Sequence, residues 1–338
     1  MQPTEFYRSS AEQIISPEQF AKIVIDWQAQ HGRNDLPWQR ENNPYHVLVS
    51  ELMLQQTQVK TVIPYFERWI TRFPDVSALS AASEDEVMQL WQGLGYYRRA
   101  RNLQAAATTV VNQYDGQIPS SALELREIPG IGAYTVGAIR AFAYDAPGAI
   151  VDGNVKRLFA RLFTLPFLIN KSSHDRYFWD LAEHYTPQSQ NRRFAQGLLD
   201  LGATLCKPKQ PDCEVCPFHA SCLSLKHDQV SAFPKRQAKK PIPTRQGYFI
   251  LDLNTEGVLL EKRDASSVWP NLWSLPELLT APDSEPFGQF THTFSHYKLE
   301  ASIWRQPTTL KPQQQRVPLS AIGTLGLPAP IRKYLQQV

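Results

Sequence analysis

Residues 128–135 read Ile128-Pro129-Gly130-Ile131-Gly132-Ala133-Tyr134-Thr135 and lie between two segments with helical periodicity, 123–128 and 133–143. A glycine can adopt a positive φ without steric cost, so the pattern predicts a helix, a tight turn and a second helix. The second helix would begin just after Gly132 and leave its first backbone N–H groups free. Such a helix end favours an anion, and a phosphate of a nucleic-acid backbone fits it well. An ordinary turn between two helices is the alternative interpretation, and this stretch alone does not exclude it.

The bulk composition is that of an ordinary globular protein. The chain has 338 residues, 42% of them hydrophobic and 20% charged, so we expect two or three domains. The net charge is only +3, so any contact with nucleic acid must come from local basic patches. No run of about 18 apolar residues occurs, and residues 1–16 have no basic-then-apolar signal pattern. These observations predict a cytoplasmic protein without a membrane span.

A carboxyl residue is predicted inside an apolar helix. Residues 44–59 form a helical pattern that is apolar nearly all round as far as Gln55, and such a helix is buried. Glu51 would therefore lie among apolar neighbours, where a carboxyl without a partner has a raised pKa. Two interpretations stay open: Glu51 caps a neighbouring helix or pairs with an arginine, or it acts as an acid in catalysis. The polar residues 55–58 predict an exposed tip at the end of this helix.

Two other segments carry polar chemistry. Asp152 lies in Val151-Asp152-Gly153-Asn154, about twenty residues after the hairpin glycines. Residues 93–101, Gly93-Leu94-Gly95-Tyr96-Tyr97-Arg98-Arg99-Ala100-Arg101, combine glycines, tyrosines and arginines. This mixture suits a loop that grips a nucleic-acid strand, with aromatic rings that stack and arginines that meet phosphates. A helix start with a solvated basic face explains the same residues equally well.

The cysteines form a tight comb, Cys206-x6-Cys213-x2-Cys216-x5-Cys222, and the chain has no others. A secreted disulfide framework would spread its cysteines out, so the comb predicts a metal site in a reducing compartment. Zinc ribbons usually pair two Cys-x-x-Cys knuckles, whereas this comb has one. We therefore favour a four-cysteine iron–sulfur cluster over zinc. Its expected role is structural, to present the basic loop between Cys206 and Cys213.

Composition divides the chain into four segments. Residues 1–15 have no clear period and predict a loose extension, whereas residues 16–225 carry successive helical patterns. Residues 226–246 are basic and contain prolines, which is typical of a linker. Residues 247–338 change to the period of strands, and predict a small α+β domain that starts with a hairpin over 248–262.

Two capping boxes mark helix starts in the second segment. Ser16-Pro17-Glu18-Gln19 and Ser83-Glu84-Asp85-Glu86 each have a serine three residues before a Gln or Glu. Further helical patterns run over residues 66–73, 100–114, 155–163, 177–184 and 193–201.

Together these motifs resemble the adenine DNA glycosylase family, MutY, of the helix-hairpin-helix superfamily that also contains endonuclease III. The resemblance covers nearly the whole chain. It implies a mainly α fold of two lobes around a substrate cleft, with the hairpin motif at about 122–143, an iron–sulfur loop at 206–222 and a C-terminal α+β Nudix-like domain. It also implies excision of adenine mispaired with 8-oxoguanine or guanine in duplex DNA, after the base is flipped out of the stack.

The resemblance further implies roles for individual residues. Glu51 matches the general acid that protonates adenine at N7, and Asp152 matches the carboxylate that stabilises or attacks the oxocarbenium-like sugar. Tyr134 and Asn154 match residues that support Asp152. The other matches are the adenine pocket (Trp38, Leu54, Gln196), DNA-binding residues (Gln56, Thr57, Tyr96, Gly130, Gly132, Lys156), the loop that senses 8-oxoguanine (Phe294, Ser295, His296) and the ligands of a [4Fe-4S] cluster (Cys206, Cys213, Cys216, Cys222).

One position separates two related activities. Endonuclease III relatives carry a lysine where this chain has Tyr134, and that lysine forms the Schiff base that drives strand cleavage. We therefore expect a monofunctional glycosylase, with Lys156 matching a lysine that can be trapped by reduction but is not required. No Arg-Glu-x-x-Glu-Glu pattern follows Gly247, so Nudix hydrolase activity is not expected.

The expected protein is a monomer that acts on double-stranded DNA containing these mispairs, in the cytoplasm of a bacterium and at its nucleoid. Two alternatives stay open. One is a bifunctional glycosylase and AP lyase on oxidised pyrimidines, and the other is a non-catalytic iron–sulfur protein that binds DNA.

Overall fold

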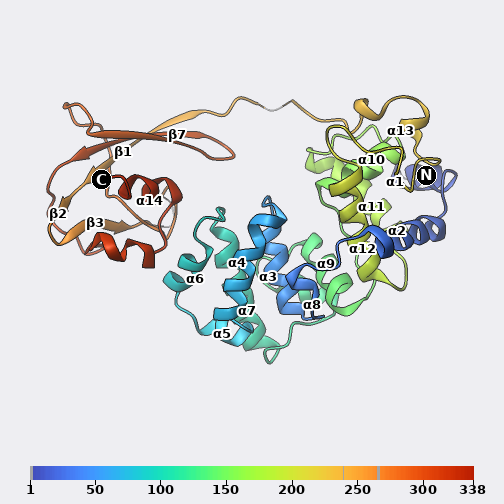
Figure 1. Cartoon of the computed structure of the whole chain (residues 1–338), viewed down its shortest axis with the longest axis horizontal. Helices are drawn as coiled ribbons and strands as arrows, with labels where there is room; N and C mark the ends of the chain where they lie inside the picture. The colour runs from blue at the N-terminus through green and yellow to red at the C-terminus, as the bar shows by residue number, and fades with distance from the viewer. Residues whose placement is uncertain (1–2, 239, 265–266) are drawn as a thin grey trace. The chain divides into compact units, whose positions relative to one another are not determined.

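The computed structural model describes residues 3–238, 240–264 and 267–338. The chain divides into two compact units, one made of Met1–Ser80 and Asn102–Ala238, the other of Ala81–Arg101 and Lys239–Val338. The first unit is helical and the second contains the strands (Figure 1). Within the described ranges, no helix is long and apolar enough to cross a membrane.

The N-terminal residues are helical. Helix α1 (Pro3–Glu12) packs against α11 (Asp175–Tyr185), where Arg8 forms an ion pair with Asp180. The expectation of a loose extension is therefore wrong. The reason is that a short helix gains most of its stability from tertiary packing, which local periodicity does not reveal.

Most other helices of the first unit match predicted patterns, but α4 starts seven residues before the predicted 66–73, and α5 and α13 were not predicted. The other helices of this unit are α2 (Pro17–His31), α3 (Pro44–Leu54), α4 (Val59–Arg72), α5 (Val76–Ala81), α7 (Arg98–Gln113), α8 (Ala122–Glu127), α9 (Ala133–Tyr144), α10 (Gly153–Leu162), α12 (Asn191–Asp200) and α13 (Leu223–Lys226). Helix α3 ends at Leu54 and does not continue to Val59, because the chain turns at Gln56, which has a φ of 57°. The exposed polar tip predicted after this helix is confirmed.

Helices α8 and α9 form the predicted hairpin, and its two glycines have different structural roles. Gly130 has a φ of 80°, and a Cβ atom there would lie 2.6 Å from the Cβ of Asn102. Only glycine fits both the backbone and this close approach. Gly132 is the N-cap of α9 with a φ of −88°, and nothing would lie within 4 Å of a Cβ there. Gly132 therefore keeps the start of α9 open.

Helices α2 and α12 pack very closely. A Cβ atom on Gly197 would lie 2.7 Å from Val24 Cγ1, so glycine is required at this crossing. The same core contains Phe20, which stacks on Phe218 with ring centroids 4.9 Å apart. Phe218 lies in the cysteine-rich segment, so this stacking anchors that segment to the helical core.

The second unit contains two sheets. The first has the order β5-β1-β7-β6, in which β1 and β7 are parallel and the other pairs antiparallel. In the second sheet, β3 pairs with β2, β4 and β8. The strands are β1 (Thr244–Leu251), β2 (Leu253–Asn254), β3 (Gly257–Lys262), β4 (Trp273–Ser274), β5 (Glu277–Leu278), β6 (Gly288–Thr293), β7 (Lys298–Arg305) and β8 (Gln314–Val317), and helix α14 (Ala329–Leu335) packs against β6.

The hairpin predicted over residues 248–262 is confirmed at its turn, where β2 pairs with β3, but is wrong for the longer strands on either side. Strand β1 pairs with β7, which lies far along the chain, and β3 belongs to the other sheet. Only the two residues of β2 pair with β3 across the turn. Local alternation predicts a strand correctly but does not reveal a distant partner.

By their spatial contacts, residues 81–101 group with the strands, whereas the sequence predicts that they are part of the helical domain 16–225. Helix α6 (Glu84–Trp91) starts at the predicted cap, Ser83, whose side chain accepts the N–H of Glu86. Side-chain contacts attach α6 to the sheets: Asp85 lies 2.8 Å from Lys262 Nζ, and the Asn271 amide donates to Glu84 at 2.9 Å.

Candidate active site

Two carboxyl groups and a phenol influence one another from α3, α9 and the start of α10. Helix α3 packs against α9, so that the hydroxyl of Tyr134 hydrogen-bonds the carboxyl of Glu51. Asp152 is the N-cap residue of α10, and its charge acts on both of these groups. The structure thus brings together three residues that the sequence analysis singled out.

Glu51 is an acid suited to neutral pH. The residue is only 5% exposed. Burial raises the pKa of Glu51 from 4.5 to about 7, the hydrogen bond from Tyr134 opposes this shift, and the charge of Asp152 adds to it. Burial also keeps the pKa of Tyr134 well above 10, so its hydroxyl is a neutral donor. A substantial fraction of Glu51 is therefore protonated near neutrality and able to give up a proton.

Asp152 has a different environment. Its Oδ1 accepts the backbone N–H groups of Asn154 and Val155, both at 2.8 Å, and its Oδ2 accepts the Asn154 amide at 2.9 Å. Burial raises the pKa of Asp152, and these hydrogen bonds together with the charge of Arg157 oppose that shift. Three N–H donors favour a carboxylate over a carboxylic acid. The pair therefore consists of one carboxyl in an apolar setting and one surrounded by donors.

Arg157 connects this pair to the cysteine segment. Its guanidinium donates to Asn154 Oδ1 at 2.9 Å, to the carbonyl of Gly202 at 2.6 Å and to the carbonyl of Cys206 at 2.7 Å. The residue is 4% exposed. Arg157 is not among the site residues predicted from the sequence. Its signal was a position three residues after Asn154, on the face of α10 that also carries buried apolar residues.

Glu51 also lines a pocket of about 180 Å³, together with Trp38 and Gln196. Leu54, the third residue predicted for this pocket, is not among its lining residues and lies half-buried at the end of α3. The other lining residues are Gln28, Asn34, Gln39, Glu41, Asn42, Val47, Ser50, Phe142, Arg192 and Arg193. The pocket thus offers an aromatic wall, several amides and two carboxyl residues, Glu41 and Glu51, of which Glu51 is the one with a raised pKa.

The predicted DNA-binding residues lie on the surface of the two units, with one exception. In the first unit, Gln56 is exposed in the turn after α3 and Thr57 is half-buried beside it, while both hairpin glycines are exposed. In the second unit, Tyr96 is 49% exposed and has a φ of 49°. Lys156 is the exception, because its side chain is only 14% exposed. Its ammonium donates to Asp175 Oδ1 at 2.6 Å.

The predicted 8-oxoguanine loop connects β6 to β7. The Phe294 N–H donates to the carbonyl of Tyr297 at 2.8 Å, which closes the turn, and the two rings stack with centroids 4.6 Å apart. Ser295 and His296 are exposed at the tip. The loop therefore presents two polar side chains on an aromatic base.

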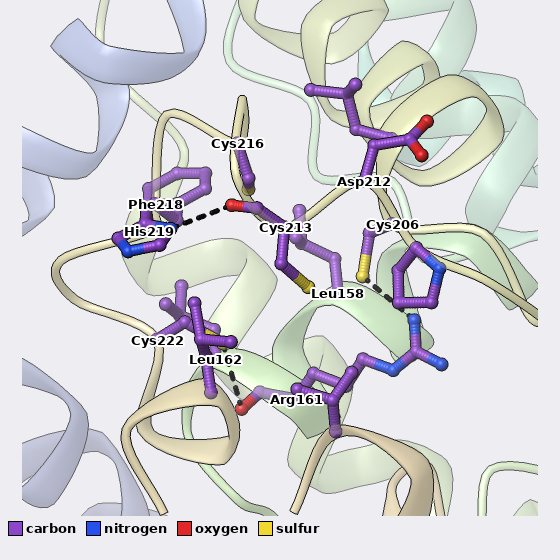
Figure 2. Close-up of a pocket in the computed structure, with 14 residues that line it drawn as sticks. Leu158, Arg161, Leu162, Cys206, Asp212, Cys213, Cys216, Phe218, His219 and Cys222 are labelled. Carbon is purple, nitrogen blue, oxygen red and sulfur yellow. Dashed lines mark hydrogen bonds between the residues drawn. The ribbon is translucent and has the colours of Figure 1, made fainter. Parts of the chain in front are cut away.

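The four cysteines face one pocket, whose wall includes Leu158 and Leu162 of α10 (Figure 2). Arg161 Nη1 lies 3.4 Å from Cys206 Sγ, and the same guanidinium donates to the carbonyl of Lys207 at 2.7 Å. Among the described residues, no three His, Cys, Asp or Glu side chains are gathered in a way that could hold a metal ion. What the structure contributes is therefore a shared pocket for all four thiols, with a cation at its edge.

Comparisons with known proteins agree with this architecture. A model for "HhH-GPD superfamily base excision DNA repair protein" matches residues 49–184, and a "NUDIX domain" model matches residues 247–337. A protein named adenine DNA glycosylase from Buchnera aphidicola subsp. Baizongia pistaciae is 33% identical, over 94% of this chain and 96% of its own. The Homo sapiens protein of that name is 30% identical, over 84% of this chain and 66% of its own.

A solved structure is also similar. The structure titled as a thermostable thymine-DNA glycosylase superposes with a TM-score of 0.57 and 27% identity, and covers 62% of this chain and 97% of its own. The helix-hairpin-helix fold and the C-terminal domain predicted from the sequence are both confirmed. Because relatives at 30% identity or more match along nearly its whole length, this chain belongs to the adenine DNA glycosylase family.

Proposed function

We propose that this chain removes adenine mispaired with 8-oxoguanine or guanine from duplex DNA, as a monofunctional glycosylase. The observation that carries the proposal is the pair Glu51 and Asp152, two carboxyls in unlike environments of which one acts electrostatically on the other. Glycosidic bond cleavage needs one carboxyl that donates a proton and one that stabilises positive charge. The names of the relatives, adenine DNA glycosylase, point to the same substrate.

In the proposed reaction, the flipped adenine enters the pocket that Glu51 lines. Glu51 transfers its proton to N7, the C1′–N9 bond breaks, and the bonding electron pair leaves with adenine. The sugar becomes oxocarbenium-like, and the carboxylate of Asp152 stabilises it. A water molecule then adds to C1′ and releases a proton, which leaves an abasic site. Tyr134 and Asn154 hold the two carboxyls in place through the hydrogen bonds described above.

Two observations support a glycosylase without lyase activity. The residue beside the carboxyl pair is Tyr134, whose neutral hydroxyl is no amine nucleophile. The amine of Lys156 is engaged with Asp175. We propose that the enzyme therefore releases the base and leaves the strand intact.

We also propose a [4Fe-4S] cluster held by Cys206, Cys213, Cys216 and Cys222. The residue types fit such a group, because four thiols line one pocket with apolar walls and an arginine at its edge, although the described side chains are not gathered as metal ligands. Burial raises the pKa of Cys216 to about 12, so this thiol becomes a thiolate ligand only when a metal compensates the charge. When bound, the cluster supplies a structural cross-link. Through Arg157 the cysteine segment supports Asn154 and hence Asp152.

The C-terminal unit is proposed to recognise 8-oxoguanine through the loop Phe294-Ser295-His296. The support is its exposed hydroxyl and imidazole, which suit an oxidised base edge with added donors and acceptors. The proposed site of action is duplex DNA in the cytoplasm of a bacterial cell, at the nucleoid, with the protein as a monomer.

The deciding experiment uses a duplex with a single 8-oxoguanine:A pair. Released adenine is measured by chromatography, and strand breaks are measured before and after alkali. We expect adenine release with breaks only after alkali, and no release by Glu51→Gln. Glu183→Gln, a change on the exposed face of α11, is the matched control and should keep wild-type activity. Breaks without alkali would indicate lyase chemistry, and tight binding without adenine release would indicate a non-catalytic DNA-binding protein.

A further inference from the structure

A buried chain of hydrogen bonds forms part of the pocket that Glu51 lines, and the proposed reaction does not use it. The chain runs from Arg33 through Asp200 and Gln196 to Gln39, and so links α12 to the segment after α2. Asp200 is 0% exposed and Gln196 is 7% exposed. Because several members can only donate or only accept, the orientation of each amide in the chain follows from chemistry.

The backbone sets the orientation of Gln39. Its Oε1 accepts the N–H of Leu36 at 3.1 Å, and its Nε2 donates to the carbonyl of Arg33, also at 3.1 Å. A backbone N–H only donates and a backbone carbonyl only accepts, so flipping this amide would break both bonds. Nε2 therefore also donates to Gln196 Oε1, at 2.8 Å.

Asp200 sets the orientation of Gln196 from the other end. Asp200 Oδ1 accepts from Gln196 Nε2 at 2.8 Å and from Arg33 Nε at 2.7 Å, and Oδ2 accepts the Arg33 backbone N–H at 2.8 Å. The arginine pairs the buried charge, and a carboxylate only accepts. If Gln196 were flipped, its Oε1 would face Asp200 Oδ1, which sets two acceptors against each other. Its Nε2 would face Gln39 Nε2, which sets two donors against each other. The network thus permits one orientation.

After these bonds, Gln196 has one N–H and one carbonyl lone pair left, and it is one of the residues that line the pocket. Adenine carries its N6 amino donor beside the acceptor N1, on the edge away from N7, and a glutamine amide is complementary to such a donor–acceptor edge through two hydrogen bonds. A 6-oxo purine such as guanine or hypoxanthine has an acceptor, O6, in place of the amino group. To pair its O6 and N1–H edge, Gln196 would have to flip.

We propose that Asp200, paired with Arg33, and Gln39 lock the amide of Gln196 and so make the pocket select a 6-amino purine over a 6-oxo purine. In this assignment Gln196 contacts the base, and Asp200 and Gln39 are positioning residues. The inference rests on the proposed function, since it requires the excised base to occupy this pocket.

The test compares base release from two duplexes under single-turnover conditions, one with adenine and one with hypoxanthine opposite 8-oxoguanine. Asp200→Asn removes the acceptor–acceptor mismatch that a flipped Gln196 would meet at Asp200, so that only the mismatch at Gln39 still opposes the flip. Gln39→Glu places an acceptor against Oε1 of the unflipped Gln196 and removes the donor–donor mismatch of the flipped one, so that only the mismatch at Asp200 still opposes the flip. We expect each variant to lower the adenine-to-hypoxanthine rate ratio by about 10-fold, within the range of discrimination of one bidentate pair. A purely structural role would slow both substrates alike and leave the ratio unchanged.

Asp180→Asn is the matched control, because it removes a carboxylate from another ion pair of the same unit and should keep the wild-type ratio. Gln39 is only half-buried, so its variant keeps the test valid if Asp200→Asn fails to fold, as judged by thermal unfolding. If the rate ratio is unchanged in either folded variant, the inference is overturned. The proposed function still stands in that case, provided that the wild-type protein releases adenine. Wild-type protein that releases no base overturns both.

Discussion

Replacing Glu51 with glutamine should make the protein more stable, and increasingly so as pH rises. Folding raises the pKa of Glu51 from 4.5 to about 7 by burial. A raised carboxyl pKa contributes stability that is fully present below pH 4.5 and is lost as the pH rises through about 7, because the buried group must then ionise. The shift corresponds to about 3 kcal/mol, most of which, about 2–3 kcal/mol, is lost between pH 5 and pH 8.

Glutamine has nearly the shape of the protonated acid, still accepts the Tyr134 hydrogen bond and does not ionise. The free energy of unfolding of Glu51→Gln minus that of the wild type should therefore grow by about 2–3 kcal/mol from pH 5 to pH 8. The assay is denaturant unfolding of both proteins, with any bound cluster retained, followed by tryptophan fluorescence at the two pH values. Glu183→Gln, at an exposed position of α11, should show no such growth. A difference that stays constant with pH would refute a raised pKa, and a difference that shrinks would mean that the folded protein stabilises the carboxylate.

Four other outcomes follow from the geometry. The single-turnover rate should fall as pH rises above about 7, because the protonated form of Glu51 is the proposed acid, and a rate that rises there would contradict this. Gly130→Ala should lower the free energy of unfolding by about 1–3 kcal/mol, because residue 130 has a φ of 80°. Gly132→Ala should lower it by at most about 1 kcal/mol. Equal losses in the two variants would show that the turn is unstrained. Arg157→Met should lose about 3 kcal/mol in denaturant unfolding because buried acceptors lose their partner, and a loss below 1 kcal/mol would count against the link. Cys216→Ser should lower the bound iron measured by elemental analysis, and an unchanged iron content would remove Cys216 from the ligand set.

The sequence by itself determined the features that depend on neighbouring residues. Gly130 marks the turn because only glycine takes its backbone conformation cheaply. Ser83 marks a helix start because its hydroxyl accepts an N–H three residues on. Glu51 could be identified because the apolar residues around it on one helix already imply burial, and hence the raised pKa. The cysteine comb predicts one shared site through its spacing alone.

Only the tertiary structure decided which distant residues meet. Helix α1 forms because α11 is there to pack against it, and β1 pairs with β7 and not with the strand that follows it. Arg157 reaches Cys206, Arg33 pairs with Asp200, and Gln39 donates to Gln196 through contacts between residues that are far apart in the chain. Hydrogen bonds and packing of this kind depend on distance in space, which local periodicity and propensity do not encode. The chemistry of the site could therefore be predicted from its residue types, whereas the network that orients its side chains could not.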